Sequence, residues 1–287
     1  MTAQGPPEGH RYRAVAPWPG KRIRALGVSI RDGVAPPPSC PEYGDVIAWY
    51  DDLAVRVQTE LDSLDWVSLL ESRPYRVTSR AKTLDTLREK LRRDRSTPLE
   101  SVQDVAGVRF EADMTLDEQD AVAHAISAMF LQPPSSIHDL RRAPHAGYRA
   151  VHVWLRLPAR VEVQVRTTLQ GEWANAYESF ADIAGRGVRY GEVPDDASLA
   201  SFMLQLQALS VDQCALLEGE INTLDLAARA LRDEFDQRSD ESEASAEAHA
   251  RIARRSAAVQ EAKVLFTEGL RDVRRAFDLL AAERRAR

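Results

Sequence analysis

GYRAVHVWLRLPARVEVQVRT occupies residues 147–167 and contains two short runs in which apolar and polar side chains alternate. From residue 151 onward, the Val and Leu side chains of both runs stand at odd-numbered positions, and most of them are valine. A period of two with β-branched residues is typical of half-buried β-strands. Pro158 and Ala159 form a short connector between the runs, so the stretch predicts an antiparallel hairpin.

The other side of this predicted hairpin carries an unusual set of polar side chains, namely Tyr148, His152, Glu162, Gln164 and Arg166. A solvent-facing strand surface more often mixes Thr, Lys and Ser. On this stretch alone, two interpretations stay open. The side chains are either ordinary cross-strand polar pairs on a surface or parts of a chemical site.

Composition places the chain among ordinary globular proteins. It has 287 residues, 44% of them hydrophobic and 29% charged, with a net charge of −6. These values argue against a disordered chain, a membrane protein or a protein that coats nucleic acid, although a local basic patch remains compatible with them. Cys40 and Cys214 form no metal-ligand pair and favour a reducing compartment. Without an apolar leader or a long apolar run, we expect a cytoplasmic protein that is independent of membranes.

Periodicity along the chain predicts a mixed architecture. Residues 1–40 are rich in Gly, Pro and Arg and predict a loose arm. Apolar residues at three- and four-residue steps predict helices over 43–70, 79–93, 116–131 and 169–183. Alternation around Val108 and Phe110 predicts one more strand within 101–113. The order of these elements indicates an α+β fold, in which helices flank a mixed β-sheet.

The pattern changes after Gly191. Apolar residues from Cys214 to Phe235 follow helical steps, and those from Ile252 to Leu280 recur every seven residues. We expect two long helices, separated by the Ser/Glu-rich segment 236–250, that form an antiparallel coiled hairpin over residues 195–287. An oligomerisation arm is the alternative.

Two carboxylates stand where predicted strands begin or pair. Asp104 precedes the strand within 101–113, and Glu162 lies on the polar face of the hairpin. Together with bound phosphates, two carboxylates make a typical Mg²⁺ site. A cluster of Arg80, Lys82, Lys90 and Arg166 would offset the charge of a polyphosphate. Since Tyr148 offers a face for a base, the residues indicate phosphoryl or pyrophosphoryl transfer from a nucleotide.

Other chemistries lack their motifs. The chain has no Walker-type phosphate loop, no dinucleotide fingerprint and no H-E-x-x-H zinc motif. His124 and the pair His138-Asp139 suggest part of a metal phosphohydrolase site, but further His and Asp ligands are not well placed for it.

From about residue 80 to residue 191, the chain resembles the synthetase domain of the RelA/SpoT alarmone synthetases. Five separated pieces occur in the family's order: Arg80-x-Lys82 with Thr86 and Lys90, then DVAGVR at 104–109, GYRAVH at 147–152, EVQVRT at 162–167, and Trp173-Ala174 with Glu178. The resemblance implies a nucleotidyltransferase-like synthetase fold over residues 41–194. It also implies transfer of the β,γ-pyrophosphate of ATP to the 3′-hydroxyl of GDP or GTP.

The resemblance assigns roles to individual residues. Arg80, Lys82, Thr86 and Lys90 would bind ATP, with the arginine at adenine and the lysines at phosphates. Asp104 and Glu162 would be the catalytic carboxylates and would bind magnesium. The acceptor would meet Tyr148 as the residue that stacks on guanine, His152 as a polar contact, and Gln164 and Arg166.

One departure leaves the acceptor open. Before Gly147 the family usually has a lysine after the proline, whereas this chain has His145 and Ala146, with Arg141 and Arg142 upstream. We expect the protein to lack the upstream hydrolase domain and the regulatory modules of long members, so that its layout resembles small and toxic alarmone synthetases. One alternative is transfer to the 3′ end of tRNA, with Arg141, Arg142, His145 and basic residues of the N-terminal arm holding the RNA. A degenerate nucleotide-binding module, or a homo-oligomer or regulatory partner bound through the C-terminal helices, is also open.

Overall fold

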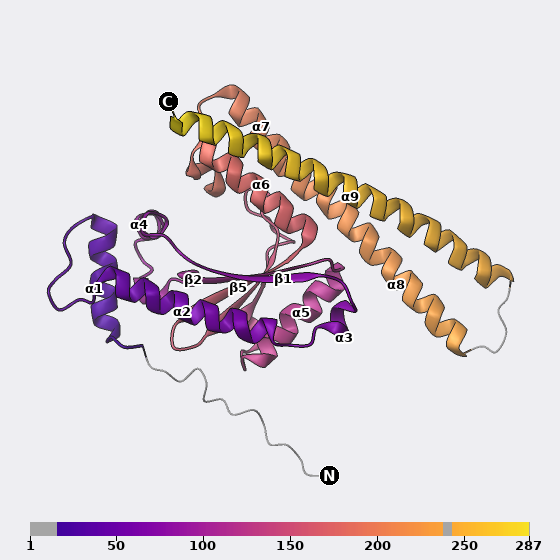
Figure 1. Ribbon diagram of the computed structural model, residues 1–287, viewed down its shortest axis with the longest axis horizontal. Helices are drawn as coiled ribbons and strands as arrows, with labels where there is room; N and C mark the ends of the chain where they lie inside the picture. The colour runs from indigo at the N-terminus through magenta and orange to yellow at the C-terminus, as the bar shows by residue number, and fades with distance from the viewer. Residues whose placement is uncertain (1–15, 238–242, 287) are drawn as a thin grey trace, which may run out of the picture.

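The computed structural model describes residues 16–237 and 243–286, and a five-stranded mixed sheet lies at its centre (Figure 1). The strands are β1 (Tyr75–Ala81), β2 (Ala106–Ala112), β3 (Ile137–Asp139), β4 (Val151–Arg156) and β5 (Arg160–Thr167), in the spatial order β1-β2-β5-β4-β3. β2 and β5 pair in parallel, while the other neighbouring strands pair antiparallel. The α+β prediction is confirmed.

The predicted hairpin is present as β4 and β5. Their register pairs Val153 with Val163 and His152 with Gln164, so the valines share one face and the polar residues share the other. The register continues the polar face across the sheet, because Gly107 of β2 lies between Arg80 of β1 and Glu162 of β5. The polar face of the hairpin is therefore part of a larger surface that four strands build.

The apolar face of the sheet forms the main core with three helices. These are α2 (Tyr43–Asp62), the short α3 (Val67–Leu70) and α5 (Leu116–Met129). Val108, Phe110 and Val163 are completely buried there. Beyond β1, α1 (Gly20–Asp32) packs on α4 (Leu84–Arg93) and on the 3-10 turn η1 (Leu99–Ser101). A second 3-10 turn, η2 (Pro134–Ser136), leads into β3.

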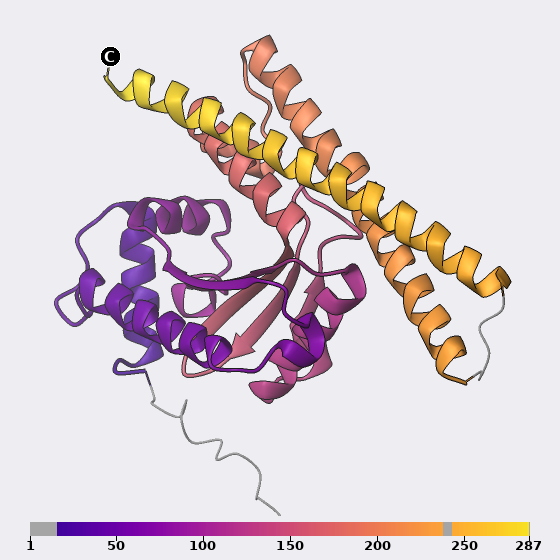
Figure 2. The same cartoon turned by 45° about the vertical axis from the view of Figure 1, so that its right-hand side comes forward.

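The polar face carries α6 (Thr168–Ala184), which begins directly after β5. The 3-10 helix η3 (Arg186–Tyr190) and α7 (Ala197–Ala208) follow it. A π-helix, η4 (Leu209–Cys214), then joins α7 to the long α8 (Ala215–Gln237), and α9 (Glu243–Ala286) runs back along α8 and α6 (Figures 1 and 2). Trp173, Phe180, Leu206 and Phe277 lie in a second core between α6, α7 and α9. No helix of the described residues is long and apolar enough to cross a membrane.

Several sequence-based boundaries differ from the structure. The helix expected over 79–93 begins only at Leu84, and Ser79 and Arg80 belong to β1. The helix expected over 43–70 breaks after Asp62. The loose arm expected over 1–40 contains α1, whose Ile23, Leu26 and Ile30 are buried, while residues 1–15 lie outside the described residues.

The C-terminal helices are also longer and differently packed than the heptad pattern predicted. Most of the Ser/Glu-rich segment 236–250 is helical, since α8 ends at Gln237 and α9 begins at Glu243. Leu280 of the predicted seam is 49% exposed, whereas Leu270 and Phe277 are buried against α6 and α7. α9 therefore packs on the body of the protein and does not pair with α8 alone.

Candidate active site

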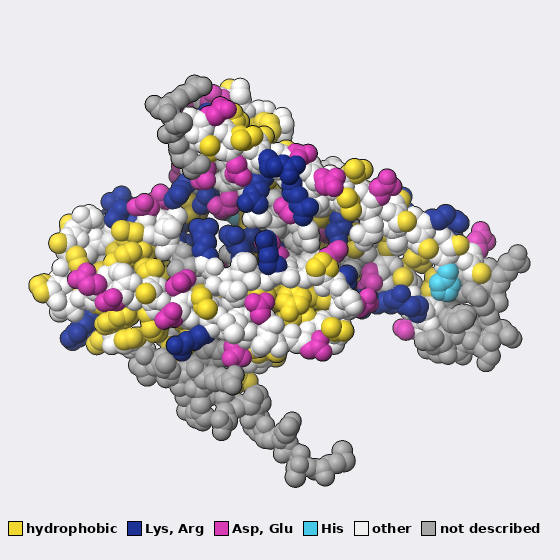
Figure 3. Space-filling model, in the orientation of Figure 1, with side chains coloured by type: hydrophobic (Ala, Val, Ile, Leu, Met, Phe, Trp, Pro, Cys, Tyr) yellow, Lys and Arg dark blue, Asp and Glu magenta, His cyan; other side chains and the backbone are white. Residues whose placement is uncertain are grey.

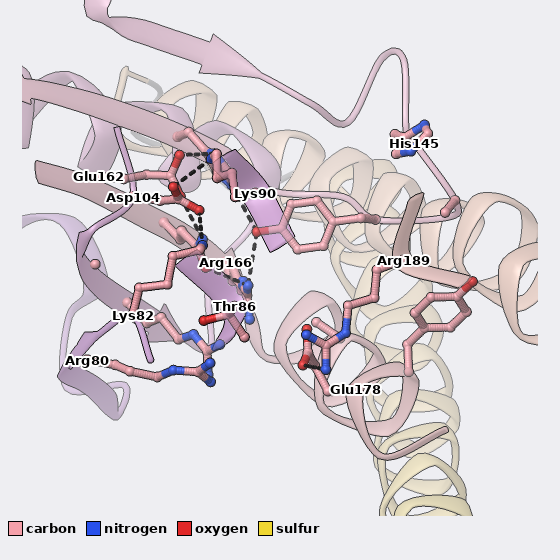
Figure 4. A pocket seen from close by; sticks show the side chains of 18 of the residues that line it. Arg80, Lys82, Thr86, Lys90, Asp104, His145, Glu162, Arg166, Glu178 and Arg189 are labelled. Carbon is pink, nitrogen blue, oxygen red and sulfur yellow. Dashed lines mark hydrogen bonds and ion pairs between the residues drawn. The ribbon is translucent and has the colours of Figure 1, made fainter. Parts of the chain in front are cut away.

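A cavity of about 380 Å³ lies on the polar face of the sheet, between α4 on one side and α6 and η3 on the other. Lys and Arg side chains gather along this hollow in Figure 3. Eleven of the thirteen site residues predicted from the sequence line it: Arg80, Lys82, Thr86, Lys90, Asp104, His145, Tyr148, His152, Glu162, Gln164 and Arg166. The polar side chains of the hairpin thus meet those of four other segments in one cavity (Figure 4).

Asp104 joins the two lysines of the cavity. Its carboxylate oxygens accept hydrogen bonds from Lys82 Nζ at 2.5 Å and from Lys90 Nζ at 2.6 Å. Lys82 follows β1, and its backbone N–H bonds to the carbonyl of Val105, so Lys82 is held beside Asp104. Burial opposes ionisation of Asp104, but the two ammonium groups outweigh it and keep the pKa of Asp104 below its usual value. Asp104 is therefore ionised at neutral pH.

The N-terminus of α4 fixes Thr86 and Lys90. Thr83 caps this helix, because its hydroxyl oxygen accepts the backbone N–H of Thr86. The Thr86 hydroxyl in turn donates to the Thr83 carbonyl at 2.9 Å. Lys90 stands one turn further along, and Leu87 and Leu91 hold the helix against the core. The cap and the apolar face of α4 thus aim its lysine at the cavity.

Glu162 is the second carboxylate of the cavity, and it is 7% exposed. It pairs with His152 Nδ1 at 3.1 Å and accepts a hydrogen bond from Gln164 Nε2 at 2.8 Å. Burial opposes both charges of the Glu162–His152 pair. Their mutual attraction dominates, so the pKa of Glu162 falls and that of His152 rises. Glu162 is ionised and His152 is protonated at neutral pH.

Tyr148 connects the remaining hairpin residues. Its hydroxyl lies 2.9 Å from His152 Nε2 and accepts a hydrogen bond from Arg166 Nη2 at 2.9 Å. Arg166 Nη2 also donates to Gln164 Oε1 at 2.6 Å. Arg166 is 3% exposed, and its guanidinium carbon lies 5.1 Å from the centre of the Tyr148 ring. A continuous hydrogen-bonded chain therefore runs from Glu162 to Tyr148.

The two carboxylates lie beside one another, as Figure 4 shows, and each opposes ionisation of the other through its charge. Lys90 lies close enough to lower the pKa of both. Among the described residues, no group of three acidic, His or Cys side chains is arranged to hold a metal ion by itself. Two carboxylates suit a hard ion such as Mg²⁺ that takes its other ligands from water and phosphate.

The structure does not bring Arg141 or Arg142 to the cavity. Arg141 is largely buried and pairs with Asp139 and Asp120, and its Nη1 also bonds to Gln119. Arg142 is 88% exposed and pairs with Asp139. The reason is the turn after β3, where the Asp139 carboxylate accepts the backbone N–H and side chain of Arg141. Arg141 thus serves the fold, whereas His145 does line the cavity.

The sequence-based set omitted several residues that line the cavity, namely Gly107, Arg109, Arg189 and Tyr190. Arg109 alternates with Val108 and Phe110 in β2, so its place on the polar face was available from the sequence. Burial, with Arg166 and Arg80 nearby, lowers the pKa of Arg109. Arg189 and Tyr190 lie in η3, after α6, and it is the three-dimensional fold that brings them to the cavity. The Arg93 guanidinium carbon of α4 lies 3.4 Å from the centre of the Tyr190 ring, so this contact joins α4 to η3.

Residues 79–180 match the family model described as a region found in RelA / SpoT proteins. The chain is also 50% identical over 194 residues to the uncharacterized protein Rv1366 of Mycobacterium tuberculosis, covering 67% of this chain and 70% of that protein. An uncharacterized protein of Mycobacterium bovis matches to the same extent. The chain belongs to the RelA/SpoT family. All five pieces on which the sequence resemblance rested contribute residues to the cavity.

Two small alarmone synthetases of known structure are similar to this chain. The small alarmone synthetase 2 from Bacillus subtilis is 16% identical, with a TM-score of 0.50, and the similarity covers 64% of this chain and 98% of that one. The small alarmone synthetase 1 from the same organism is 20% identical, with a TM-score of 0.49, and the similarity covers 68% and 98%. At such identities the likeness concerns the fold.

Proposed function

We propose that the protein is an ATP-dependent pyrophosphokinase that transfers the β,γ-pyrophosphate of ATP to the 3′-hydroxyl of GDP or GTP. The single observation that carries the proposal is the cavity in which Asp104 and Glu162 lie side by side between the lysines and the Tyr148–Arg166 pair. Membership of the RelA/SpoT family supports the same reaction class.

The donor side of the cavity is the cationic one. Lys82 and Lys90 point at the carboxylate of Asp104, so phosphate oxygens that enter there compete for the same ammonium groups. Arg80 and Arg109 lie on the same face of β1 and β2. No carboxylate in the described part of the chain lies within ion-pair distance of either arginine, which leaves both guanidinium planes available to a base or a phosphate.

The acceptor side of the cavity is the side that Tyr148 lines. A guanine that stacks on the Tyr148 ring would place its ribose toward His152 and Glu162, since these side chains share the hydrogen-bonded chain with Tyr148. In the reaction, the 3′-oxygen forms a bond to the β-phosphorus of ATP. The bond from this phosphorus to the oxygen bridging the α-phosphate breaks, AMP leaves, and the hydroxyl proton passes by way of Glu162 to solvent.

Glu162 is better suited to orient the acceptor hydroxyl than to act as a strong base toward its proton. His152 lowers the pKa of Glu162, so Glu162 is a weak base. As an ionised carboxylate it can still accept a hydrogen bond from a hydroxyl. Phosphoryl transfer with a loose transition state needs little help from a base and depends on positioning and charge neutralisation. The protonated His152 then serves to keep Glu162 ionised and fixed.

Mg²⁺ is proposed as the cofactor, held by Asp104 and Glu162, because the donor set consists of two neighbouring carboxylates. When bound with ATP, it would neutralise charge on the transferred phosphates. Asp104 and Glu162 would then exchange part of their contacts with lysine and histidine for contacts with the ion.

The proposal is tested with γ-labelled ATP and magnesium, with GDP, GTP or deacylated tRNA as the acceptor. We expect a labelled guanine nucleotide as the product. Asp104→Asn and Glu162→Gln should lower the rate by about a thousandfold or more, while far-UV circular dichroism stays unchanged. Glu89→Gln is the matched control, because this exposed carboxylate of α4 does not line the cavity.

Each outcome decides one part of the proposal. Full activity in either purified variant contradicts the assigned carboxylates. A labelled tRNA without a labelled guanine nucleotide contradicts the acceptor and keeps the chemistry. No product with any acceptor, together with calorimetric binding of nucleotides, identifies a binding module and contradicts the enzyme.

A further inference from the structure

Glu218 is a buried carboxylate at the start of α8, outside the segment 79–180 that matches the family model. It is 4% exposed and pairs with Arg149 Nη1 at 2.6 Å, and Arg149 is itself 5% exposed. This contact is an ion pair by distance and not an aligned hydrogen bond. The other carboxylate oxygen accepts a hydrogen bond from the Thr167 hydroxyl. One side chain of the C-terminal region therefore contacts both the segment before β4 and the last residue of β5.

Both partners of Glu218 adjoin residues of the cavity. Arg149 directly follows Tyr148, and Thr167 directly follows Arg166. The Tyr148 hydroxyl and Arg166 Nη2 form the 2.9 Å hydrogen bond that closes the acceptor side. Thr167 also caps α6, since its hydroxyl oxygen accepts the backbone N–H of Gln170. Each partner of Glu218 is therefore joined by one peptide bond to a residue of that hydrogen bond. A displacement of Glu218 would displace Tyr148 and Arg166 as well.

The charges make this connection specific. A buried guanidinium needs a partner, and Glu218 is the one carboxylate within ion-pair distance of Arg149 among the described residues. The π-helix η4 supplies the only other polar contact that the structure gives this side chain in the described part of the chain, the carbonyl of Ser210 at 3.5 Å from Arg149 Nη1. Both η4 and α8 therefore contact the Arg149 side chain.

The segment before α8 shapes the backbone on the other side of Tyr148. Gly147 has a φ of +80°, and a Cβ there would lie 2.9 Å from Trp173 and 3.0 Å from the Cα of Gln207. Trp173 Nε1 donates to the carbonyl of Leu206 at 2.6 Å. The backbone on both sides of Tyr148 therefore rests on the C-terminal helices.

We propose that Glu218 is a positioning residue for the acceptor side of the active site, and that α7, η4 and α8 are a structural part of that site. The inference rests on the proposed function for its kinetic consequence. Glu218 acts through Arg149 and Thr167, which hold Tyr148 and Arg166 at the distance that an acceptor base requires. The donor residues lie on or beside β1, α4 and β2, and among the described residues the side-chain hydrogen bond and ion pair of Glu218 go to Thr167 and Arg149 instead.

The test compares three variants of the full-length chain. Glu218→Gln removes the charge that Arg149 needs, and Glu218→Asp keeps the charge but is too short to reach both partners. Glu220→Gln is the control, because Glu220 is a more exposed residue of α8 that pairs with Arg255. We expect the acceptor KM to rise by about tenfold or more in both Glu218 variants. The KM for ATP should stay within about twofold in all three.

A second measurement keeps the inference testable if the proposed reaction fails or a variant folds poorly. Tyr148 is replaced by 3-fluorotyrosine, and its fluorine NMR signal is recorded without substrate. The signal should move in Glu218→Asp and Glu218→Gln but not in Glu220→Gln. An unmoved signal, or equal changes in the KM for donor and acceptor, overturns the inference. A wild-type protein that makes no product overturns the proposed function, while a moved signal still supports the positioning role.

Discussion

At the scale of single residues, Arg109 shows how a site differs from an ordinary surface. It lies in the cavity on β2, where burial and the neighbouring charges of Arg166 and Arg80 lower its pKa. A cation placed among cations destabilises the empty protein. The arrangement becomes favourable only when anionic phosphates enter the cavity.

Replacing Arg109 by alanine should therefore separate stability from function. We expect the KM for ATP to rise by about tenfold or more, since a charge-assisted contact is lost. The free energy of unfolding should stay the same or increase, because repulsion from Arg80 and Arg166 is relieved. Steady-state kinetics and urea unfolding measure the two quantities. Arg56→Ala, at an exposed position of α2, is the control that should change neither, and a clear loss of stability in Arg109→Ala would contradict the argument.

At the scale of elements, local periodicity predicted the strands that bury one alternating face. It missed elements whose position depends on contacts with distant parts of the chain. The hairpin alternates cleanly because one face meets the apolar core, so β4 and β5 were predictable. β1 was missed because its sequence, YRVTSRA, carries one buried valine and is held by pairing with β2. The helical pattern of α4 was consequently extended back over Arg80.

The site residues follow the same division. Side chains on the polar face of the hairpin were predictable, since the strand register alone sets their direction. Arg141 and Arg142 were assigned from their nearness to Gly147 in the sequence, but Asp139 and Asp120 hold Arg141 elsewhere. Arg189 and Tyr190 depend on how α6 turns back toward α4, and no short-range pattern reports that path.

Glu118 connects three elements and predicts a pH dependence of stability. It stands in the capping box of α5 and pairs with Arg73 at 2.6 Å and with Arg229 of α8 at 2.8 Å. Burial opposes its ionisation, but the hydrogen bonds and charges around it win and lower its pKa from 4.5. A carboxylate with a depressed folded-state pKa stabilises the protein above its unfolded-state pKa. That contribution is lost as the pH falls through the folded-state value.

Glu118→Gln tests this linkage, because glutamine keeps the capping box but not the charge. At pH 7 we expect the variant to lose about 1–2 kcal/mol of unfolding free energy. The difference from the wild type should shrink as the pH falls below 4.5, the ordinary pKa from which that of Glu118 is lowered. Urea unfolding between pH 3 and pH 8 measures it. A difference that is constant with pH would show that the ion pairs contribute nothing.

At the scale of the whole molecule, the predicted C-terminal hairpin is present as α8 and α9, and the structure also packs α9 on the synthetase body. α9 runs along α6, where Arg271 bonds to Glu172, and Lys263 reaches Asp113 next to β2. Phe277 completes the second core with Phe180 and Phe202. A detachable flap would leave this core open, so we expect the helices to unfold together with the sheet.

Cys214 reports on this question in the full-length chain. It lies at the end of η4, 1% exposed, and burial raises the pKa of its thiol to about 12. Alkylation requires the thiolate, so at pH 8 Cys214 should react with iodoacetamide only when the C-terminal helices leave the body. The partly exposed Cys40 serves as the internal control and should react without denaturant. If the helices and the sheet form one cooperative unit, labelling of Cys214 followed by mass spectrometry should have the same urea midpoint as circular dichroism. A midpoint at clearly lower urea would show that the helices open first, and Tyr148 would then lose the support of Glu218 before the sheet unfolds.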